Sequence, residues 1–362
     1  MEIIAYLSIA YLGIRLIVAL VNLVSWRSQK FGKPLGKPFI SILIPARNEE
    51  KNIGSILDDL QRVDYKDVEI LVYDDDSEDG TAEVIRDKIL SDKRIKYLHG
   101  SGPPLGWLGK NFACDQLARQ AKGDYFLFLD ADVRLNPRVL DNSLAWMEKH
   151  QLALFSIFPV QIMKTPGEWF TVPIVNRILV GNLPLIRVRK SRIVDFAAAN
   201  GQFMMFDAEI YKNYWFHEQF RLERAEDIQI LRMLKKKGHR VDTILSGGQV
   251  SCRMYMDYKQ GIDGFSKNIH AFFGKNWLIL LLYNLITTLG IFAVLMTFSK
   301  VITFIYLATL IGFCIVVSIQ SRQSVWKNII FMPFQQFSVV LISVIAAYRN
   351  FAGGLSWKGR KI

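Results

Sequence analysis

Residues 38–81 read PFISILIPARNEEKNIGSILDDLQRVDYKDVEILVYDDDSEDGT. Two apolar runs in this stretch, Phe39–Ile44 and Val68–Tyr73, flank a segment with apolar residues at helical spacing, Asn52–Arg62. Short apolar runs that alternate with helices predict parallel strands buried on both faces. The predicted fold class is therefore α/β, with a mainly parallel sheet. The alternation continues with helices expected at Asp79–Leu90 and Lys110–Ala121, and with strands expected at Ile95–Leu98, Tyr125–Leu129 and Leu152–Gln161.

Three acidic clusters stand where these strands end or where a later helix begins. They are Asp74–Asp76, Asp130 with Asp132, and Glu226 with Asp227. The chain carries a formal net charge of +12, so carboxylates gathered at strand ends run against its composition. Because ligands of open parallel sheets bind outside the carboxyl ends of the strands, the clusters predict a ligand site there.

Each cluster also has a structural explanation. Three consecutive aspartates form a polar turn, but they repel one another unless a cation or donor is near, which favours a functional role for Asp74–Asp76. The D-x-D of Asp130 and Asp132 can ligate a hard divalent cation such as Mg²⁺ or Mn²⁺, although many loops contain this pattern. Glu226 and Asp227 precede a helical pattern, where the helix dipole alone explains acidic residues.

Two further loops are candidate contacts. Pro45–Glu50 closes the first strand and either opens toward a ligand or caps the next helix. Lys110 follows a loop with glycines at 106 and 109, and it either reaches a phosphate or sugar or is a solvated lysine at a helix start. The histidines show no metal-ligand spacing, and no nucleophilic triad is recognisable.

The first 26 residues are apolar over the length that a bilayer core requires, which predicts an uncleaved N-terminal anchor. A cleavable signal peptide would also be apolar, but a cationic start and a small-residue cleavage site are missing. Arg15 is costly in lipid, so we expect its face of the helix to turn toward protein or the interface. Arg27, Lys30, Lys33 and Lys37 follow at once, which predicts a cytoplasmic catalytic domain.

The C-terminal third is apolar again. Trp277–Phe298 and Val301–Gln320 predict a helical hairpin, and Ile329–Tyr348 is a weaker third segment with a proline and two glutamines. If all three span, the basic tail lies outside, against the positive-inside rule. We therefore expect the third segment to be re-entrant or interfacial. Trp169–Leu185 is strongly apolar but is broken by two prolines, and residues 253–276 place aromatic residues beside lysines. Both patterns predict segments at the membrane interface and not core.

These features predict five parts: an anchor at 1–26, a catalytic domain at 38–252, an amphipathic interface segment at 253–276, membrane helices at 277–348 and a basic tail at 349–362. The cations cluster beside apolar segments and form no stripe interleaved with aromatics. The expected partner is thus a bilayer with anionic lipids, and nucleic acid is not expected. The three cysteines are far apart and indicate no disulfide framework.

Four motifs in order and spacing, IPARNEE, DDDSEDGT, LDADV and AEDIQILRMLKKKG, resemble those of the family 2 inverting glycosyltransferases. The resemblance covers about residues 38–275. It implies the Rossmann-like GT-A fold, a UDP-sugar donor and a divalent metal. By position, it implies that Pro45, Ala46 and Glu49 contact the nucleotide. It implies that Asp75 reads uracil with Asp74 beside it, that Asp130 and Asp132 form the D-x-D with Asp132 on the metal, and that Asp227 is the general base with Glu226 as its neighbour.

A narrower likeness rests on PPLGWLGKNFACDQLA, AANGQFMMFDAEIY, GFSKNIHAFFGKN and the terminal WKGRK. These segments resemble membrane glycosyltransferases that modify isoprenoid lipids such as carotenoids and hopanoids. The likeness implies an integral protein of the bacterial inner membrane that transfers a hexose, most simply glucose, to a lipid acceptor. The tail at 357–360 either returns to the site and offers cations to the diphosphate or binds anionic lipid.

One difference from the family's motifs concerns the kind of product that is expected. Processive polymer synthases of the family carry a Q-x-x-R-W signature, whereas here Gln249 and Arg253 are one residue further apart and the tryptophan is missing. A processive polysaccharide synthase is therefore disfavoured, and Arg253 is expected to contact the diphosphate or a lipid head group. Two more functions stay open: a polyprenyl-phosphate glycosyltransferase, whose acceptor needs no base, and a membrane scaffold without turnover.

Overall fold

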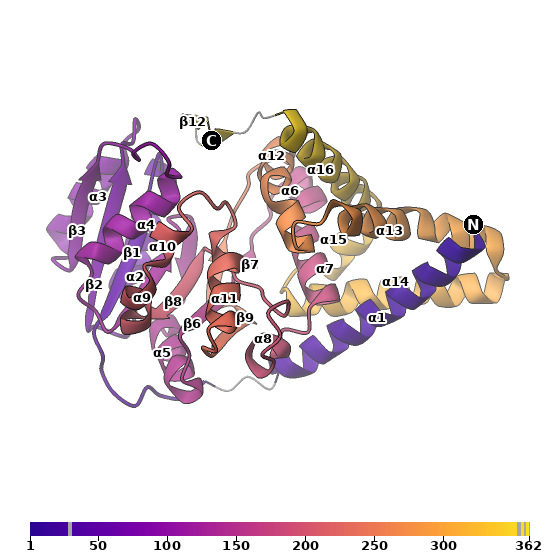
Figure 1. The fold of residues 1–362 in the computed structure, drawn as a ribbon, viewed down its shortest axis with the longest axis horizontal. Helices are drawn as coiled ribbons and strands as arrows, with labels where there is room; N and C mark the ends of the chain where they lie inside the picture. The colour runs from indigo at the N-terminus through magenta and orange to yellow at the C-terminus, as the bar shows by residue number, and fades with distance from the viewer. Residues whose placement is uncertain (28–30, 353–355, 358–359, 362) are drawn as a thin grey trace.

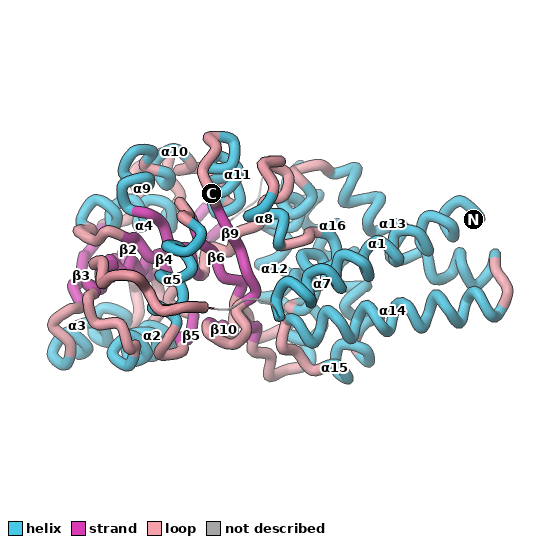
Figure 2. Tube along the Cα trace, turned by 90° about the horizontal axis from the view of Figure 1, so that it is seen from below, coloured by secondary structure: helices cyan, strands magenta, loops and turns pink. Residues whose placement is uncertain are grey.

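The computed structural model describes residues 1–27, 31–352, 356–357 and 360–361. Figure 1 shows an α/β body that contains the long strands, and a helical arm that projects from it with the N-terminus at its far end. Figure 2 shows the same division from below. The predicted α/β fold class is confirmed, with the sheet in the body and the apolar helices in the arm.

The central sheet has seven strands in the order β3-β2-β1-β4-β8-β6-β9. Within it β8 runs opposite to its neighbours β4 and β6, and all other neighbouring pairs are parallel. The mainly parallel sheet is thus confirmed as a mixed one. The strands are β1 (Ile40–Ala46), β2 (Val68–Asp75), β3 (Ile95–Gly100), β4 (Tyr125–Leu129), β6 (Leu154–Phe158), β8 (Phe203–Asp207) and β9 (Val241–Leu245).

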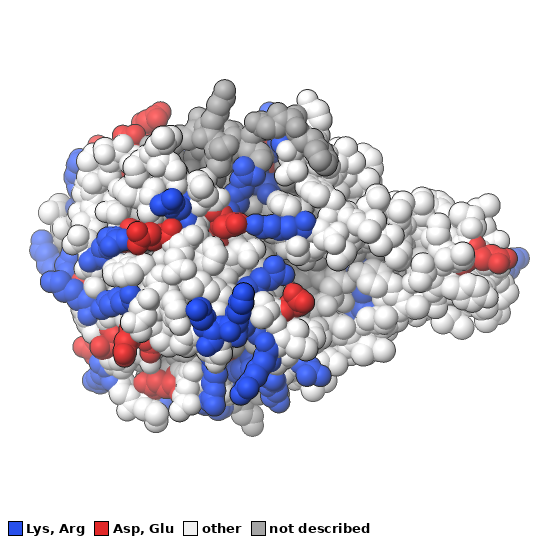
Figure 3. Space-filling view, in the orientation of Figure 1, with Lys and Arg blue, Asp and Glu red and all other residues white. Residues whose placement is uncertain are grey.

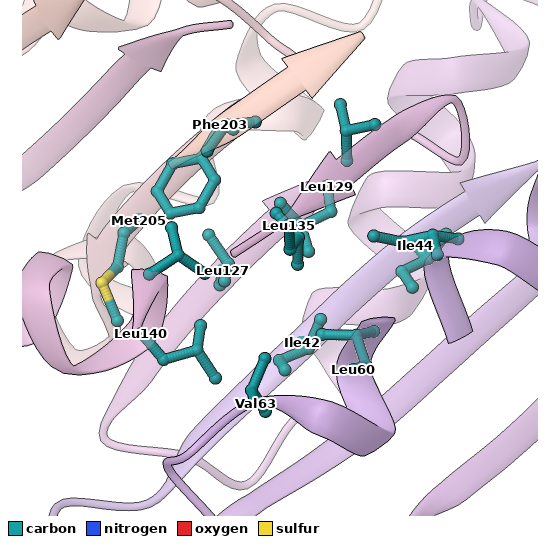
Figure 4. Packing of buried hydrophobic residues seen from close by; sticks show 14 of the residues in the cluster. Ile42, Ile44, Leu60, Val63, Leu127, Leu129, Leu135, Leu140, Phe203 and Met205 are labelled. Atoms are coloured by element: carbon teal, nitrogen blue, oxygen red, sulfur yellow. The ribbon is translucent and has the colours of Figure 1, made fainter. Parts of the chain in front are cut away.

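Helices cover both faces because successive residues of a strand point to opposite sides. In β1, Ile42 and Ile44 pack under one layer of helices, and Leu43 packs under the other. Figure 4 shows the first of these two cores, where Leu60 lies beside Ile42. The first layer is α2 (Glu50–Arg62), α3 (Thr81–Ser91) and α5 (Val139–His150), and the second is α4 (Gly109–Gln120), α9 (Ala208–Tyr214), α10 (Phe216–Gln219) and α11 (Glu226–Lys236).

A three-stranded sheet at the carboxyl edge of the main sheet consists of β5 (Val133–Leu135), β10 (Val250–Cys252) and β7 (Val160–Gln161). The strand predicted at Leu152–Gln161 is therefore divided into β6 and β7, with Pro159 between them. In the antiparallel pair of β5 and β10, Cys252 lies opposite Val133. This pairing fixes the direction of the chain directly after Asp132.

Among the described residues, three helices are long and apolar enough to cross a membrane. They are α1 (Glu2–Arg27), α13 (Trp277–Thr297) and α14 (Lys300–Gln320), and they form the arm. In Figure 3 the arm is almost entirely white, whereas Lys and Arg side chains gather over the body. An apolar arm beside a charged body is the division expected of a membrane anchor.

Arg15 of α1 turns toward protein, as predicted. Its side chain is buried, and Nη2 donates to the carbonyl oxygen of Arg177 over 3.0 Å. The guanidinium also lies over the ring of Phe313, 4.4 Å from its centroid. These contacts remove the charge from the lipid-facing side of the helix.

The segment Trp169–Leu185 differs from the prediction of a membrane-surface segment. It forms the second half of α6 (Pro166–Thr171) and all of α7 (Pro173–Asn182), and α8 (Ile186–Lys190) follows. Apolar residues of α7 such as Ile174 and Ile178 are buried among the membrane helices and α12 (Tyr258–Asn268). The prediction that this segment is not core is wrong, because protein covers its apolar face.

The interface segment predicted at residues 253–276 is likewise covered in part. It contains α12 (Tyr258–Asn268) and the 3₁₀ helix η1 (Ile269–Phe273). Ile262, Phe265 and Ile269 are buried in the same cluster as residues of α7 and α16 (Met332–Ala352). The segment is amphipathic as expected, but its apolar face joins the body to the membrane helices.

The third C-terminal segment consists of α15 (Val325–Ile330) and α16 (Met332–Ala352). Pro333 stands in the first turn of α16, where a proline costs no hydrogen bond. Gln335 is buried and accepts a bond from Nη1 of Arg177 at 3.0 Å. Since α16 is not among the apolar spans of the described chain, its re-entrant or interfacial position stays a prediction.

The tail contains two short antiparallel strands, β11 (Ser356–Trp357) and β12 (Arg360–Lys361). Of the basic tail proposed to act on the diphosphate, Lys358 and Gly359 lie outside the described residues. Both functions suggested for the tail therefore stay predictions.

Candidate functional site

A cavity of about 1040 Å³ opens at the carboxyl ends of β1, β2 and β4. The parallel register of these strands puts their ends at one edge of the sheet, so loops distant in sequence meet there. The structure brings most of the predicted site residues into this one cavity: Pro45, Ala46, Glu49, Asp75, Lys110, Asp130, Asp132, Glu226 and Asp227. Asp74 and Arg253 are not among the residues that line it.

The members of the first acidic cluster, Asp74–Asp76, have different positions: one stabilises a turn and another faces the cavity. Asp74 is 2% exposed, and its carboxylate accepts from the backbone N–H of Ser77 at 3.0 Å and from the hydroxyl of Tyr97 at 2.9 Å. The carbonyl oxygen of Asp75 accepts from Nη1 of Arg47 at 2.6 Å. Asp74 thus holds the turn after β2, and Asp75 is the member of the cluster that faces the cavity.

The D-x-D connects two sheets. Asp130 follows β4, and Asp132 directly precedes β5. Nε2 of Gln202 lies 3.3 Å from Oδ1 of Asp132. Burial and the nearby charge of Asp130 raise the pKa of Asp132. The charge of Asp130 disfavours the ionised form of Asp132, and a bound cation would stabilise that form.

The donor set fits a hard divalent cation only in part. Both carboxylates supply the oxygen ligands that Mg²⁺ and Mn²⁺ prefer. Within the described residues, no group of three or more His, Cys, Asp or Glu side chains is placed to hold a metal. A cation at Asp132 would therefore need oxygen ligands from a bound diphosphate, as is common for Mg²⁺ sites.

Lys110 lies between two acidic clusters. It stands in the first turn of α4, with Nζ 2.7 Å from Oδ1 of Asp130 and 3.9 Å from Oε1 of Glu226. Burial lowers the pKa of Lys110, but the two carboxylates outweigh burial and raise it. The side chain is therefore a protonated cation at the centre of the site.

The third cluster occupies the first turn of α11. Oδ2 of Asp227 accepts from the backbone N–H of Gly201 at 3.1 Å, and Oδ1 accepts from the N–H of Ile228 at 2.8 Å. Burial raises the pKa of both Glu226 and Asp227, and Lys110 opposes the shift. A carboxylate with a raised pKa is a stronger base when it is ionised, which suits proton abstraction.

Gly201 is a site residue that the sequence did not single out. A Cβ at this position would lie 3.1 Å from Nζ of Lys110 and 3.6 Å from Oε1 of Glu226. The glycine therefore allows the backbone to approach both charged groups. Gly201 and Gln202 directly precede β8. Knowing that β8 pairs with β4 would have predicted that these two residues lie at the site.

Arg253 occupies a different place from the one predicted. Its Nε lies 2.7 Å from Oε1 of Glu168, a fully buried residue of α6. The other oxygen of Glu168 accepts from the backbone N–H of Lys164 at 2.7 Å. Arg253 thus neutralises a buried carboxylate that caps α6, instead of contributing to the cavity as a diphosphate or head-group ligand.

The part of the cavity beyond the carboxylates is largely apolar. Its wall comes from α7, α12 and η1, including Val175, Phe265 and Phe272. Phe265 belongs to the core shared with α16, so this wall is continuous with the packing of the membrane-proximal helices. The loop 101–108 forms another side of the cavity, and Leu105 on it is fully exposed.

Comparisons with known proteins agree with this architecture. The chain aligns with the mannosyltransferase PcManGT from Pyrobaculum calidifontis, solved in complex with GDP-Man and Mn²⁺, with a TM-score of 0.61 over 97% of this chain and 98% of that one. The two sequences are 16% identical, so the likeness concerns the fold.

Two curated relatives match over parts of their length. The 4,4'-diaponeurosporenoate glycosyltransferase of Staphylococcus haemolyticus is 28% identical over 64% of this chain and 60% of its own length. The GalNAc(5)-diNAcBac-PP-undecaprenol beta-1,3-glucosyltransferase of Campylobacter jejuni is 35% identical over 27% of this chain and 31% of its own. The chain thus spans less than two thirds of either relative. Residues 41–218 match the family model described as Glycosyl transferase family 2. The chain therefore contains a domain that matches Glycosyl transferase family 2 at residues 41–218, and its fold is that of the GT-A proteins.

Proposed function

We propose that the protein is a membrane-bound inverting glycosyltransferase that transfers a hexose, most simply glucose, from a UDP-sugar to an isoprenoid-type lipid. One observation carries the proposal. A single cavity has the carboxylates of Asp75, Asp132 and Asp227 in one part and an apolar wall with Phe265 in another. A site with these two parts suits a charged donor and a lipid acceptor that meet within one enclosure.

The donor occupies the strand ends in this proposal. Asp75 accepts the uracil N3–H, and Pro45, Ala46 and Glu49 line the nucleoside. Asp130 and Asp132 hold Mg²⁺ or Mn²⁺, which when bound offsets the charge that develops on the departing diphosphate. The structural neighbour with GDP-Man and Mn²⁺ supports a nucleotide sugar with a divalent cation.

The reaction is one displacement at the anomeric carbon. A bond forms between the acceptor oxygen and that carbon, and the bond from the carbon to the β-phosphate oxygen breaks. Asp227 takes the proton of a hydroxyl acceptor, while its bonds from Gly201 and Ile228 fix the direction of the carboxylate. The cationic side chain of Lys110 lies near the leaving diphosphate and stabilises its negative charge.

The helical arm supports the proposed membrane position. With α1, α13 and α14 as spans, the positive-inside rule supports a cytoplasmic catalytic body at the bacterial inner membrane. Nδ2 of Asn22, near the C-terminal end of α1, donates a hydrogen bond to the carbonyl oxygen of Leu183. This contact places α8 next to the C-terminal end of α1. Three exposed cations in and after α8 are suited to anionic lipid head groups: Arg187, Lys190 and Arg192.

The proposal predicts a lipid product. We expect total lipids from cells with the gene to contain a species heavier by one hexose than a lipid of cells without it. Mass spectrometry of both extracts measures this difference. Cells that express the Asp132→Asn variant serve as the control and should match cells without the gene. Identical lipid profiles in all three strains would contradict the proposal.

A further inference from the structure

Two cationic side chains lie in the apolar part of the cavity. Lys267 is on α12, and Arg224 stands three residues before Asp227 in the loop that leads into α11. Both are partly buried, and Phe265, Phe272 and Ile228 line the cavity with them. This part of the cavity thus combines positive charge with an apolar wall, whereas the part at the strand ends is acidic.

Among the described residues, neither cation has a carboxylate within ion-pair distance. The two nearby acids are engaged elsewhere: Glu223 pairs with Lys275 at 2.8 Å, and Asp263 pairs with Arg349 at 2.6 Å. Burial lowers the pKa of both Arg224 and Lys267, and the more distant charges of Glu223 and Asp263 oppose the shift without reversing it.

We propose that the acceptor lipid carries an anionic group, a carboxylate or a phosphate, which Lys267 and Arg224 bind at the end of its apolar chain. The inference rests on the proposed function and narrows its acceptor class. An uncharged alcohol would leave both cations without a direct ion-pair partner. An anion with an isoprenoid tail would pair with the cations and also cover the apolar wall.

The position of Arg224 and Lys267 would also place the acceptor near the reacting groups. Arg224 is separated from the base Asp227 by two residues, and Lys110 bridges toward Asp130 on the donor side. An anion held by Arg224 and Lys267 therefore places the polar end of the acceptor beside α11, while its apolar chain lies along Phe265 and Phe272. Specificity arises because buried cations are costly to leave without a partner.

Equilibrium binding without a donor tests the inference apart from catalysis. The ligands are farnesoic acid, farnesyl phosphate and farnesol, which share one apolar chain, and the protein is the full chain in detergent. We expect either acid to bind about 10- to 100-fold more tightly than the alcohol, as for charge-assisted hydrogen bonds. Lys267→Gln and Arg224→Gln should each reduce this ratio by about tenfold, and Lys267→Arg should restore most of it.

Lys259→Gln is the matched control, because Lys259 is an exposed lysine of the same helix that does not line the cavity. Its acid-to-alcohol ratio should equal that of the unmodified protein. A ratio near one in the unmodified protein, or equal losses for acid and alcohol in Lys267→Gln, would overturn the inference. A preference for acids without any sugar transfer would instead retain the binding site and reject the proposed function.

Bulk lipid is the other source of anions, and a second arm separates it. The binding assay is repeated in phosphatidylcholine nanodiscs with and without phosphatidylglycerol. If the cations hold the acceptor, the acid-to-alcohol ratio stays within about twofold when phosphatidylglycerol is added, since a specific site outcompetes screened surface charge. Loss of the ratio on addition would assign the pair to lipid head groups and overturn the inference.

Discussion

Replacing Asp132 with Asn is expected to lower kcat/KM for sugar transfer on the order of a thousandfold. The carboxylate sits between β4 and β5, faces the cavity and has a pKa raised by burial and Asp130. In the proposed mechanism it holds the cation that stabilises the departing diphosphate, and a loss of several kcal/mol of transition-state stabilisation corresponds to that factor. Initial rates with saturating Mn²⁺ measure it.

The chain offers a matched control for the Asp132→Asn substitution. Asp58 is an aspartate of α2 that pairs with Lys88 and does not line the cavity, so Asp58→Asn should retain activity within about twofold. Calorimetry adds an independent readout, since Asp132→Asn should lose the Mn²⁺-dependent part of UDP binding. A variant with near-normal rates and Mn²⁺-dependent UDP binding would remove Asp132 from the metal site.

Replacing Asp227 with Asn is expected to lower transfer to a hydroxyl acceptor by about 10²- to 10⁴-fold, the usual contribution of a general base. An ionised carboxylate or phosphate acceptor needs the base much less, so the loss there should be far smaller. The measurement is kcat/KM for farnesol against farnesoic acid and farnesyl phosphate. The same substitution therefore distinguishes a hydroxyl acceptor from a polyprenyl-phosphate one.

The pH profile provides a second readout for Asp227. Burial raises its pKa in the folded protein, and a base acts only when it is deprotonated. Transfer to a hydroxyl acceptor should thus decline as pH falls through a pKa above the ordinary aspartate value of about 4, and Asp227→Asn should lack this acidic limb. Full hydroxyl transfer by Asp227→Asn would exclude Asp227 as the base.

The strands and the cavity could be predicted from the sequence because local pattern decides both. Continuous apolar runs gave β1, β2 and β4, and parallel pairing puts Asp75 and Asp130 at one edge of the sheet. The same logic fails for Asp74, because its partner Tyr97 comes from β3, whose side-chain direction depends on register. Likewise, β8 pairs between β4 and β6 through long-range contacts, so Gly201 was missed.

The wrong predictions concern what covers the apolar face of a helix, lipid or protein. The pattern of α7 and α12 shows that one side is apolar, but it contains no information on whether lipid or protein covers that side. Here α16 and α13 cover it. Arg253 illustrates the same limit for charge, since its partner Glu168 lies 85 residues away and becomes buried only in the fold.

One measurement tests most directly the claim that the cavity joins a nucleotide-sugar site to a lipid acceptor site. The purified full chain is incubated with radiolabelled UDP-glucose, Mn²⁺ and farnesoic acid or farnesol, and label is counted in the organic phase. The expected result is acceptor-dependent label of a single-hexose product, abolished in Asp132→Asn and retained in Asp58→Asn. Label that appears only in a water-soluble or polymeric product, or that does not depend on Asp132, would contradict the claim.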